Sequence, residues 1–242
     1  MKSDKDDRHF KDALYEQFAR IGHALSTPKR LEILDLLGQG ERSVEVLAGE
    51  ANLSVPNASQ HLKVLRSARL VESRRDGPFV YYKLADSAVW RLWAALRNLG
   101  ELRLTEIGQL LSSLSIDRGL ALVDRPTLRR LVEDGQVTVL DVRPRAEYEA
   151  GHIPGAISVP LEDLEQRLSE IPSDQPVVAY CRGPYCVLAV QAVELLRHHG
   201  FAARRMADGF PEWREDGLPV EATPTRYART RHMKPASKEA AK

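Results

Sequence analysis

The sequence predicts two domains of different fold class: a mainly α-helical N-terminal domain and an α/β C-terminal domain with a parallel sheet. The chain has 242 residues, which is about the length of two ordinary domains. Residues 1–112 show helical spacing of apolar residues almost throughout, whereas residues 123–220 alternate strand and helix patterns. Between them, residues 113–122 contain small polar residues and a glycine, as a short linker does.

The composition limits the classes of function. Lys and Arg number 35 against 34 Asp and Glu, a net charge of +1, so any nucleic-acid contact must come from a local patch. No apolar run approaches the roughly 20 residues of a membrane span, and the charged residues 1–7 lack the apolar core of a secretory signal. We therefore expect a cytoplasmic protein without a membrane partner. Two cysteines, Cys181 and Cys186, are too few for a disulfide scaffold, which in a reducing compartment favours a reactive role.

Three helices are predicted before residue 51. Apolar residues recur at three- and four-residue spacing over residues 9–25. Thr27 as N-cap and Pro28 at the first helical position begin a second helix, which residues 38–40, Gly-Gln-Gly, end. Ser43 is expected to cap a short third helix.

A fourth helix over residues 55–68 has an outer face suited to reading DNA. With the third helix and the tight turn at residues 52–53 it forms a helix-turn-helix pattern, whose second helix enters the major groove. Its expected buried stripe is Val55, Ala58, Leu62 and Leu65. Asn and Gln pair with adenine edges, Lys pairs with guanine, and the helix N-terminus offers N–H groups to a phosphate. The predicted DNA-binding residues are Ser54, Pro56, Asn57, Ser59, Gln60, His61 and Lys63.

A hairpin is predicted next. Residues 70–75 and 79–84 have strand patterns around a turn that contains Gly77. We expect this hairpin to be a wing, with Arg74 and Arg75 at its tip contacting the phosphate backbone or the minor groove.

One long amphipathic helix is predicted over residues 86–111. At ~1.5 Å per residue it would have more apolar surface than a small helical core can cover. Together with the first helix it is expected to form a homodimer interface. A dimer places two reading helices about one DNA turn apart, which suits an inverted-repeat operator in double-stranded DNA.

Residues 9–112 resemble the ArsR/SmtB family of winged-helix repressors. The resemblance rests on residues 27–34, TPKRLEIL, on residues 59–65, SQHLKVL, and on the Arg-Arg-Asp-Gly wing that ends in Tyr82. It implies a winged helix-turn-helix dimer that represses transcription and releases DNA when an inducer binds.

The chain departs from the metal-sensing members of that family. Some of those carry cysteines in or near the third helix, but residues 41–48 contain no thiol. Others hold metal with His and carboxylates on the last helix, and residues 86–114 contain no His. We therefore expect DNA binding without a metal site.

The C-terminal domain is expected to form a parallel α/β sheet, whose ligand chemistry lies at the carboxyl ends of the strands. Strands are predicted over residues 136–143 and 176–180 and after residue 151, and helices from residue 144, over residues 161–170 and over residues 187–200.

Cys181 follows a predicted strand and opens a Gly/Pro loop that runs to Cys186 and into a helix. Backbone N–H groups and the positive helix end converge on a sulfur at such a position. Together with Arg182 and Arg143 they would lower the thiol pKa and stabilise a thiolate or a persulfide anion. Asp141 is a further candidate, although Asp141 and Arg143 could instead form an internal ion pair.

Residues 123–218 resemble the rhodanese family. The marks are Asp141-Val142-Arg143, Glu147-Tyr148 with residues 151–156, the strand-Cys-loop-helix, and Asp208-Gly209-Phe210 with Trp213. The resemblance implies that the loop cysteine, here Cys181, accepts a sulfane sulfur from thiosulfate or a polysulfide and passes it to a nucleophile. Pro184 stands where a glycine is frequent, and Cys186 is an additional thiol. Cys186 is expected to be either a small core residue or a resolving thiol that attacks a persulfide or sulfenic acid on Cys181.

These observations predict a DNA-binding repressor whose rhodanese-like domain senses reactive sulfur or oxidation. The candidate sensor and catalytic residues are Cys181, Cys186, Arg182, Asp141 and Arg143, without a cofactor. One alternative is a thiosulfate or persulfide sulfurtransferase tethered to its operator. Another is an arsenate-related regulator or reductase, which Cys186 disfavours because those reductases usually have a longer loop that ends in Arg. Residues 221–242 are expected to be a disordered basic tail.

Overall fold

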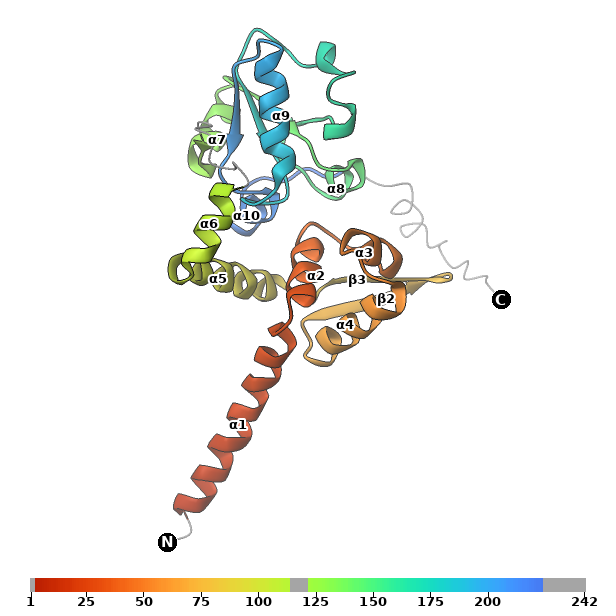
Figure 1. The fold of residues 1–242 in the computed structure, drawn as a ribbon, viewed down its shortest axis with the longest axis vertical. Coiled ribbons are helices and arrows are strands. Elements are labelled where there is room, and N and C mark those ends of the chain that lie inside the picture. The colour runs from red at the N-terminus through yellow and green to blue at the C-terminus, as the bar shows by residue number, and fades with distance from the viewer. Residues whose placement is uncertain (1–2, 114–121, 224–242) are drawn as a thin grey trace, which may run out of the picture. The chain divides into compact units, whose positions relative to one another are not determined.

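The computed structural model describes residues 3–113 and 122–223, and the chain divides into two compact units between Leu110 and Leu111 (Figure 1). Most of the predicted linker, 113–122, and of the predicted basic tail, 221–242, lies outside the described residues. Each unit is described by itself. Both predicted fold classes are confirmed, because the first unit is mainly helical and the second is α/β with a parallel sheet.

The N-terminal unit is a helical domain with a small antiparallel sheet of order β1-β3-β2. Its elements are α1 (Ser3–Leu25), α2 (Pro28–Gly38), β1 (Arg42–Ser43), α3 (Val44–Glu50), α4 (Val55–Ser67), β2 (Val71–Asp76), β3 (Phe79–Leu84), α5 (Ser87–Arg103) and the first part of α6 (Thr105–Ser113), which continues past Leu110 into the second unit. The hairpin of β2 and β3 closes at the Asp76–Phe79 pair, where Gly77 has a φ of 58°, in the left-handed region that favours glycine.

Two predicted helix caps are confirmed. The Ser43 hydroxyl accepts a hydrogen bond from the Val46 N–H, and the Ser54 hydroxyl accepts one from the Asn57 N–H, both at 3.4 Å. Thr27 lies at the N-cap of α2, but its hydroxyl has no hydrogen-bond partner among the described residues.

The core of this unit contains three of the four residues predicted for the buried stripe of α4: Ala58, Leu62 and Leu65. The prediction was wrong for Val55, which is 41% exposed. Val55 is the first residue of α4 and lies beyond the core that the later turns cover.

The single helix predicted over residues 86–111 is also wrong. Helix α5 ends at Arg103, and Leu104 has an extended backbone (φ −109°, ψ 101°) before α6 begins at Thr105. Apolar residues keep their helical spacing across this break, so the pattern does not reveal it. Gly100 and Thr105 both have low helix propensity, so interrupting the helix between them costs little free energy.

The C-terminal unit has a five-stranded parallel sheet of order β4-β8-β7-β5-β6. Its elements are β4 (Leu122–Val123), α7 (Arg125–Glu133), β5 (Thr138–Asp141), α8 (Arg145–Ala150), β6 (Ile157–Ser158), the 3-10 helices η1 (Leu161–Asp163) and η2 (Leu168–Glu170), β7 (Val177–Tyr180), α9 (Val187–His198), β8 (Ala203–Met206) and α10 (Phe210–Glu215).

Alternate residues of β7 face two separate apolar cores. Val177, Ala179 and the following Cys181 pack with α9, whereas Val178 and Tyr180 pack in the core that contains Phe210 and Trp213. All four residues of β7 are buried, as expected of a central parallel strand.

The helix predicted over residues 161–170 is wrong as a continuous element, because only the 3-10 helices η1 and η2 form there. Leu161, Leu164 and Leu168 have helical spacing, but short turns are enough to place all three against the core. Across the described ranges, no helix meets the length and apolarity that a membrane span requires.

Candidate functional site

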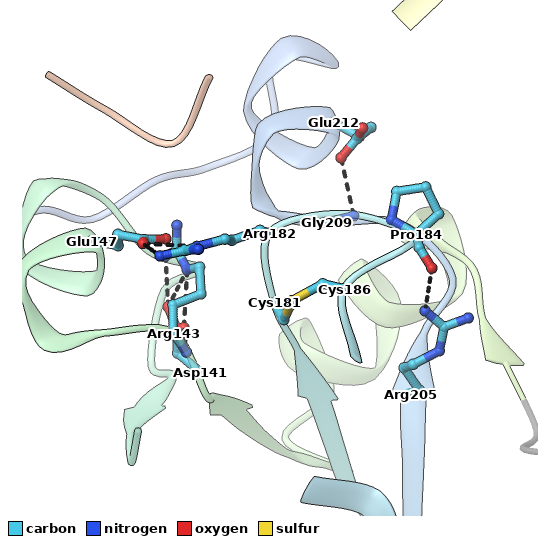
Figure 2. Close-up of a disulfide and its surroundings, with 10 residues drawn as sticks. All are labelled: Asp141, Arg143, Glu147, Cys181, Arg182, Pro184, Cys186, Arg205, Gly209 and Glu212. Atoms are coloured by element: carbon cyan, nitrogen blue, oxygen red, sulfur yellow. Dashed lines mark hydrogen bonds and ion pairs between the residues drawn. A yellow bond between two sulfur atoms is a disulfide. The ribbon is translucent and has the colours of Figure 1, made fainter. Parts of the chain in front are cut away.

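Cys181 and Cys186 lie in one short loop at the carboxyl end of the sheet. Cys181 directly follows β7, and Cys186 is the N-cap of α9. A disulfide joins the two cysteines, whose Cα atoms are 6.4 Å apart (Figure 2). Only 1% of Cys181 is exposed, whereas Cys186 is half-buried. We call residues 181–186 the cysteine loop. Its role in catalysis or sensing stays a prediction.

Hydrogen bonds to its backbone carbonyls hold this loop in place. The Phe210 N–H donates to the Cys181 carbonyl at 3.0 Å, and the Cys186 N–H donates to the Gly183 carbonyl at 3.1 Å. On β8, Nη1 of the buried Arg205 donates to the Pro184 carbonyl at 3.0 Å (Figure 2). The loop is therefore fixed by contacts from two other segments of the domain.

Arg182 was expected to stabilise a Cys181 thiolate, but its side chain is bound elsewhere. Its Nε donates to Oε1 of Glu147 at 2.9 Å, and its Nη2 donates to the same oxygen. Figure 2 shows the Arg182 side chain directed toward Glu147 and away from the disulfide. The Glu147 side chain, on α8, is only 2% exposed. In the disulfide form the positive charge of Arg182 is thus neutralised by a buried carboxylate.

Asp141 and Arg143 form a fully buried ion pair. Arg143 Nη2 lies 2.6 Å from Asp141 Oδ2 and also donates to the Gly151 carbonyl at 2.7 Å. The guanidinium lies 4.3 Å from the centroid of the Phe210 ring. The Tyr180 hydroxyl donates to Asp141 Oδ2, and burial, followed by the charge of Asp141, raises the pKa of Tyr180 well above its ordinary value. This geometry favours the internal ion pair over direct participation in chemistry.

Histidine and carboxylate side chains provide no metal site in the described part of the chain, where no group of three potential ligands lies together. His152 stacks on the Tyr148 ring, with centroids 3.7 Å apart, and its Nδ1 lies 2.8 Å from the Tyr148 carbonyl oxygen. These contacts give His152 a structural role.

The predicted reading face lies on α4. Six of its seven residues are exposed: Ser54, Pro56, Asn57, Ser59, Gln60 and Lys63. His61 is half-buried, and burial lowers its pKa, with further lowering by the charges of Arg30 and Lys29 on α2. His61 therefore differs from the other six in environment and is expected to be neutral at pH 7.

The wing positions its two arginines differently. Arg74 Nη2 lies 2.6 Å from Glu41 Oε2, its Nη1 lies 3.0 Å from Asp76 Oδ2, and the guanidinium covers the Tyr81 ring. Arg75 is exposed on β2 near the turn. A phosphate would have to compete with two carboxylates for Arg74, so Arg75 is the more accessible of the two.

The comparisons with known proteins agree with both domains. The family model described as "Bacterial regulatory protein, arsR family" matches residues 27–73, and the model of the rhodanese-like domain matches residues 124–216. The HTH-type transcriptional regulator Rv0324 of Mycobacterium tuberculosis is 44% identical over 211 residues, which cover 87% of this chain and 93% of that protein. The chain belongs to the ArsR family of bacterial regulators. It is a transcriptional regulator of this family fused to a rhodanese-like domain.

Other relatives of this ArsR-family regulator match one domain each. A sulfurtransferase of Allochromatium vinosum is 35% identical over 95 residues, which cover 39% of this chain and 87% of that protein. The solution structure of a homodimeric winged helix-turn-helix DNA-binding domain from Mycobacterium bovis has 42% identity and a TM-score of 0.39, and the match covers 43% of this chain and 92% of that one.

Three residues around the cysteine loop of the regulator were not predicted for the site. Arg205 was missed because its strand, β8, was not predicted. Glu147 belongs to a recognised motif, but no sequence pattern reveals that its carboxylate is buried beneath Arg182. Gly209 is part of the Asp-Gly-Phe motif, and only the structure shows that it packs against the loop.

Proposed function

We propose that this regulator is a repressor whose rhodanese-like domain senses reactive sulfur or oxidation through Cys181 and Cys186. The observation that carries the proposal is the disulfide within the cysteine loop. It gives one short segment two covalent states, bonded and open. Because neighbouring segments hold the loop through its backbone, a change of covalent state would alter those contacts.

The chemistry begins with both cysteines reduced. The Cys181 thiolate attacks a sulfane sulfur of thiosulfate or of a polysulfide, which forms a persulfide and releases sulfite or a shortened polysulfide. The Cys186 thiolate then attacks the Cys181 sulfur, which forms the disulfide and expels hydrosulfide. With a peroxide, Cys181 becomes a sulfenic acid, and attack by Cys186 releases water. A cellular dithiol then reduces the disulfide to the two thiols and is itself oxidised to a disulfide.

Exposed apolar residues on two helices support a homodimer. On α1 these include Phe10, Tyr15 and Phe18, each more than half exposed, and on α5 they include Leu99 and Leu102. The Mycobacterium bovis domain, which is 42% identical to the matching part of this chain, is itself homodimeric. A dimer would place two copies of α4 against the half-sites of an inverted repeat.

The experiment measures the binding of the full chain to a duplex from the region upstream of its own gene, by fluorescence anisotropy. Polysulfide is expected to weaken binding of the wild-type dithiol form by at least tenfold, about 1.4 kcal/mol. Cys181→Ser should bind equally with and without polysulfide. The sensing role is excluded if Cys181→Ser releases the duplex as the wild type does.

A second candidate function is sulfurtransferase activity, which the similarity to the Allochromatium vinosum sulfurtransferase favours. Cyanide accepts sulfane sulfur from a loaded cysteine as thiocyanate, so an assay with thiosulfate and cyanide separates the two functions. Formation of many thiocyanate molecules per chain, dependent on Cys181, would support a role as an enzyme. Loading of one sulfur per chain without turnover would support a sensor.

A further inference from the structure

Glu147 connects the cysteine loop to α8. Its Oε1 accepts two hydrogen bonds from the guanidinium of Arg182, the residue after Cys181. The Glu147 side chain is 2% exposed and the Arg182 side chain is 22% exposed. Burial of a carboxylate to this extent is costly unless a positive group pairs with it, and Arg182 provides that group.

The ion pair determines where the charge of Arg182 lies. A guanidinium beside Cys181 would stabilise a thiolate, as positive groups do for low-pKa cysteines. In the disulfide form the Arg182 side chain extends to Glu147 instead (Figure 2). Arg143 offers no replacement, because Asp141 neutralises it within a fully buried pair.

We infer that Glu147 is a positioning residue that sets the balance between the disulfide and dithiol forms of the cysteine loop. By holding the guanidinium of Arg182 at α8, Glu147 reduces the electrostatic stabilisation of a thiolate and so favours the disulfide. Stabilising the reduced form makes a cysteine pair easier to reduce. The inference rests on the proposed function, because it takes the pair to cycle between its two forms.

The reaction that reports this balance is exchange with dithiothreitol. A thiolate of the probe attacks one sulfur of the Cys181–Cys186 bond, which forms a mixed disulfide and releases the other cysteine. The second thiol of the probe then attacks the mixed disulfide and releases the cysteine that is still bonded to the probe. The probe ends as a cyclic disulfide, and the two cysteines gain the two electrons and two protons that the probe loses.

The test uses the full chain with Glu147→Gln. The protein is equilibrated with mixtures of reduced and oxidised dithiothreitol, and free thiols are counted by alkylation and mass spectrometry. We expect the equilibrium to move about tenfold toward the dithiol, which corresponds to about 30 mV. The pH dependence of alkylation should show a lower pKa for the more acidic cysteine.

Two variants of α8 serve as controls. Glu147→Asp keeps the negative charge and is expected to restore an equilibrium close to that of the wild type. Glu149→Gln removes a carboxylate from the same helix, but one that pairs with the exposed Arg145. It should leave both the equilibrium and the thiol pKa unchanged.

Arg182→Gln tests the inference from the other side of the ion pair. Without the guanidinium the equilibrium should move toward the disulfide, and adding Glu147→Gln to this variant should cause no further shift toward the dithiol. If Glu147→Gln does not fold, the direction of the Arg182→Gln shift decides the question.

The inference is overturned if Glu147→Gln keeps the wild-type equilibrium and thiol pKa, or if its shift persists without Arg182. Failure of the proposed function would look different. In that case the dithiol and disulfide forms of the wild type would bind the duplex equally, whatever the effect of Glu147.

Discussion

Gly209 packs directly against the backbone of Gly183 in the cysteine loop. A Cβ atom on Gly209 would lie 2.3 Å from the Gly183 nitrogen and 2.5 Å from the Arg182 carbonyl oxygen. The backbone of Gly209 is extended, with a φ of −117°, so its conformation is open to any residue. The close approach of two chain segments, and not backbone strain, is what requires glycine at this position.

Gly209→Ala is therefore expected to displace the cysteine loop and to destabilise the protein by roughly 1–3 kcal/mol. Chemical denaturation of the full chain measures the change in the free energy of unfolding. Gly183→Ala is the matched control, because a Cβ at Gly183 would meet nothing within 4 Å. Equal stability of the two variants would show that the contact is not restrictive.

Tyr180 should make the stability of the protein fall as the pH rises in the alkaline range. Its pKa is raised in the folded state by burial and by the charge of Asp141, whereas in the unfolded chain it titrates near 10. Above pH 10 the unfolded chain therefore loses a proton that the folded protein keeps. The free energy of unfolding should fall with rising pH, by up to about 1.4 kcal/mol per pH unit.

Tyr180→Phe removes this titration along with the hydrogen bond to Asp141. It should lower the stability at pH 8 and reduce its decline above pH 10. Denaturation series between pH 8 and pH 11 compare the two proteins. A decline of the same steepness in Tyr180→Phe would assign the alkaline sensitivity to other groups.

Gln60 and Lys63 should differ in what they contribute to DNA binding. Loss of a base contact in Gln60→Ala is expected to cost about 1–3 kcal/mol and to relax the preference for one base pair. Lys63 is predicted to pair with guanine, but its charge also attracts the phosphates, so Lys63→Ala should in addition weaken binding to all sequences and reduce the slope of log affinity against log salt by about 1.

Binding isotherms at several salt concentrations, with the duplex and with single-base variants of it, separate these effects. Arg129→Ala is a charge control, because Arg129 pairs with Glu133 on α7 of the rhodanese-like domain. The assignment of α4 as the reading helix is refuted if Gln60→Ala and Lys63→Ala both bind as Arg129→Ala does.

The proposed homodimer predicts a specific effect of charge on α1. Phe18 is 58% exposed in the single chain, and an Asp in its place would have to be buried at a dimer interface. Phe18→Asp should shift the mass measured by light scattering toward the monomer. Val46→Asp, at a comparably exposed apolar residue of α3, should keep the mass of the dimer. Unchanged mass for Phe18→Asp would place the interface elsewhere.

The sequence predicts well those features of this protein that depend on neighbouring residues. Ser43 and Ser54 begin helices as expected, and a strand followed by Cys181 and a helix is found where the pattern indicates it. Such features follow from local hydrogen bonding and from the period of the apolar residues.

Features that depend on distant residues could not be predicted in this way. The apolar spacing continues through Leu104 although the helix does not. The pairing of Arg182 with Glu147 joins residues 35 positions apart, and the carboxylate is hidden only once α8 packs on the domain. Arg182 accordingly was predicted to stabilise a thiolate on Cys181, whereas in the disulfide form it binds a carboxylate.

Cys186→Ser should separate loading of Cys181 from closure of the disulfide. If Cys186 is the resolving thiol, polysulfide will add sulfur to Cys181 in this variant, and the persulfide will persist because no second thiol can expel hydrosulfide. Mass spectrometry of the intact protein after alkylation detects the added sulfur. In the wild type the same treatment should give the disulfide, or a bridge with additional sulfur between the two cysteines. If Cys186 is instead a small core residue, the wild type and Cys186→Ser will carry the same adduct, and the resolving role is excluded.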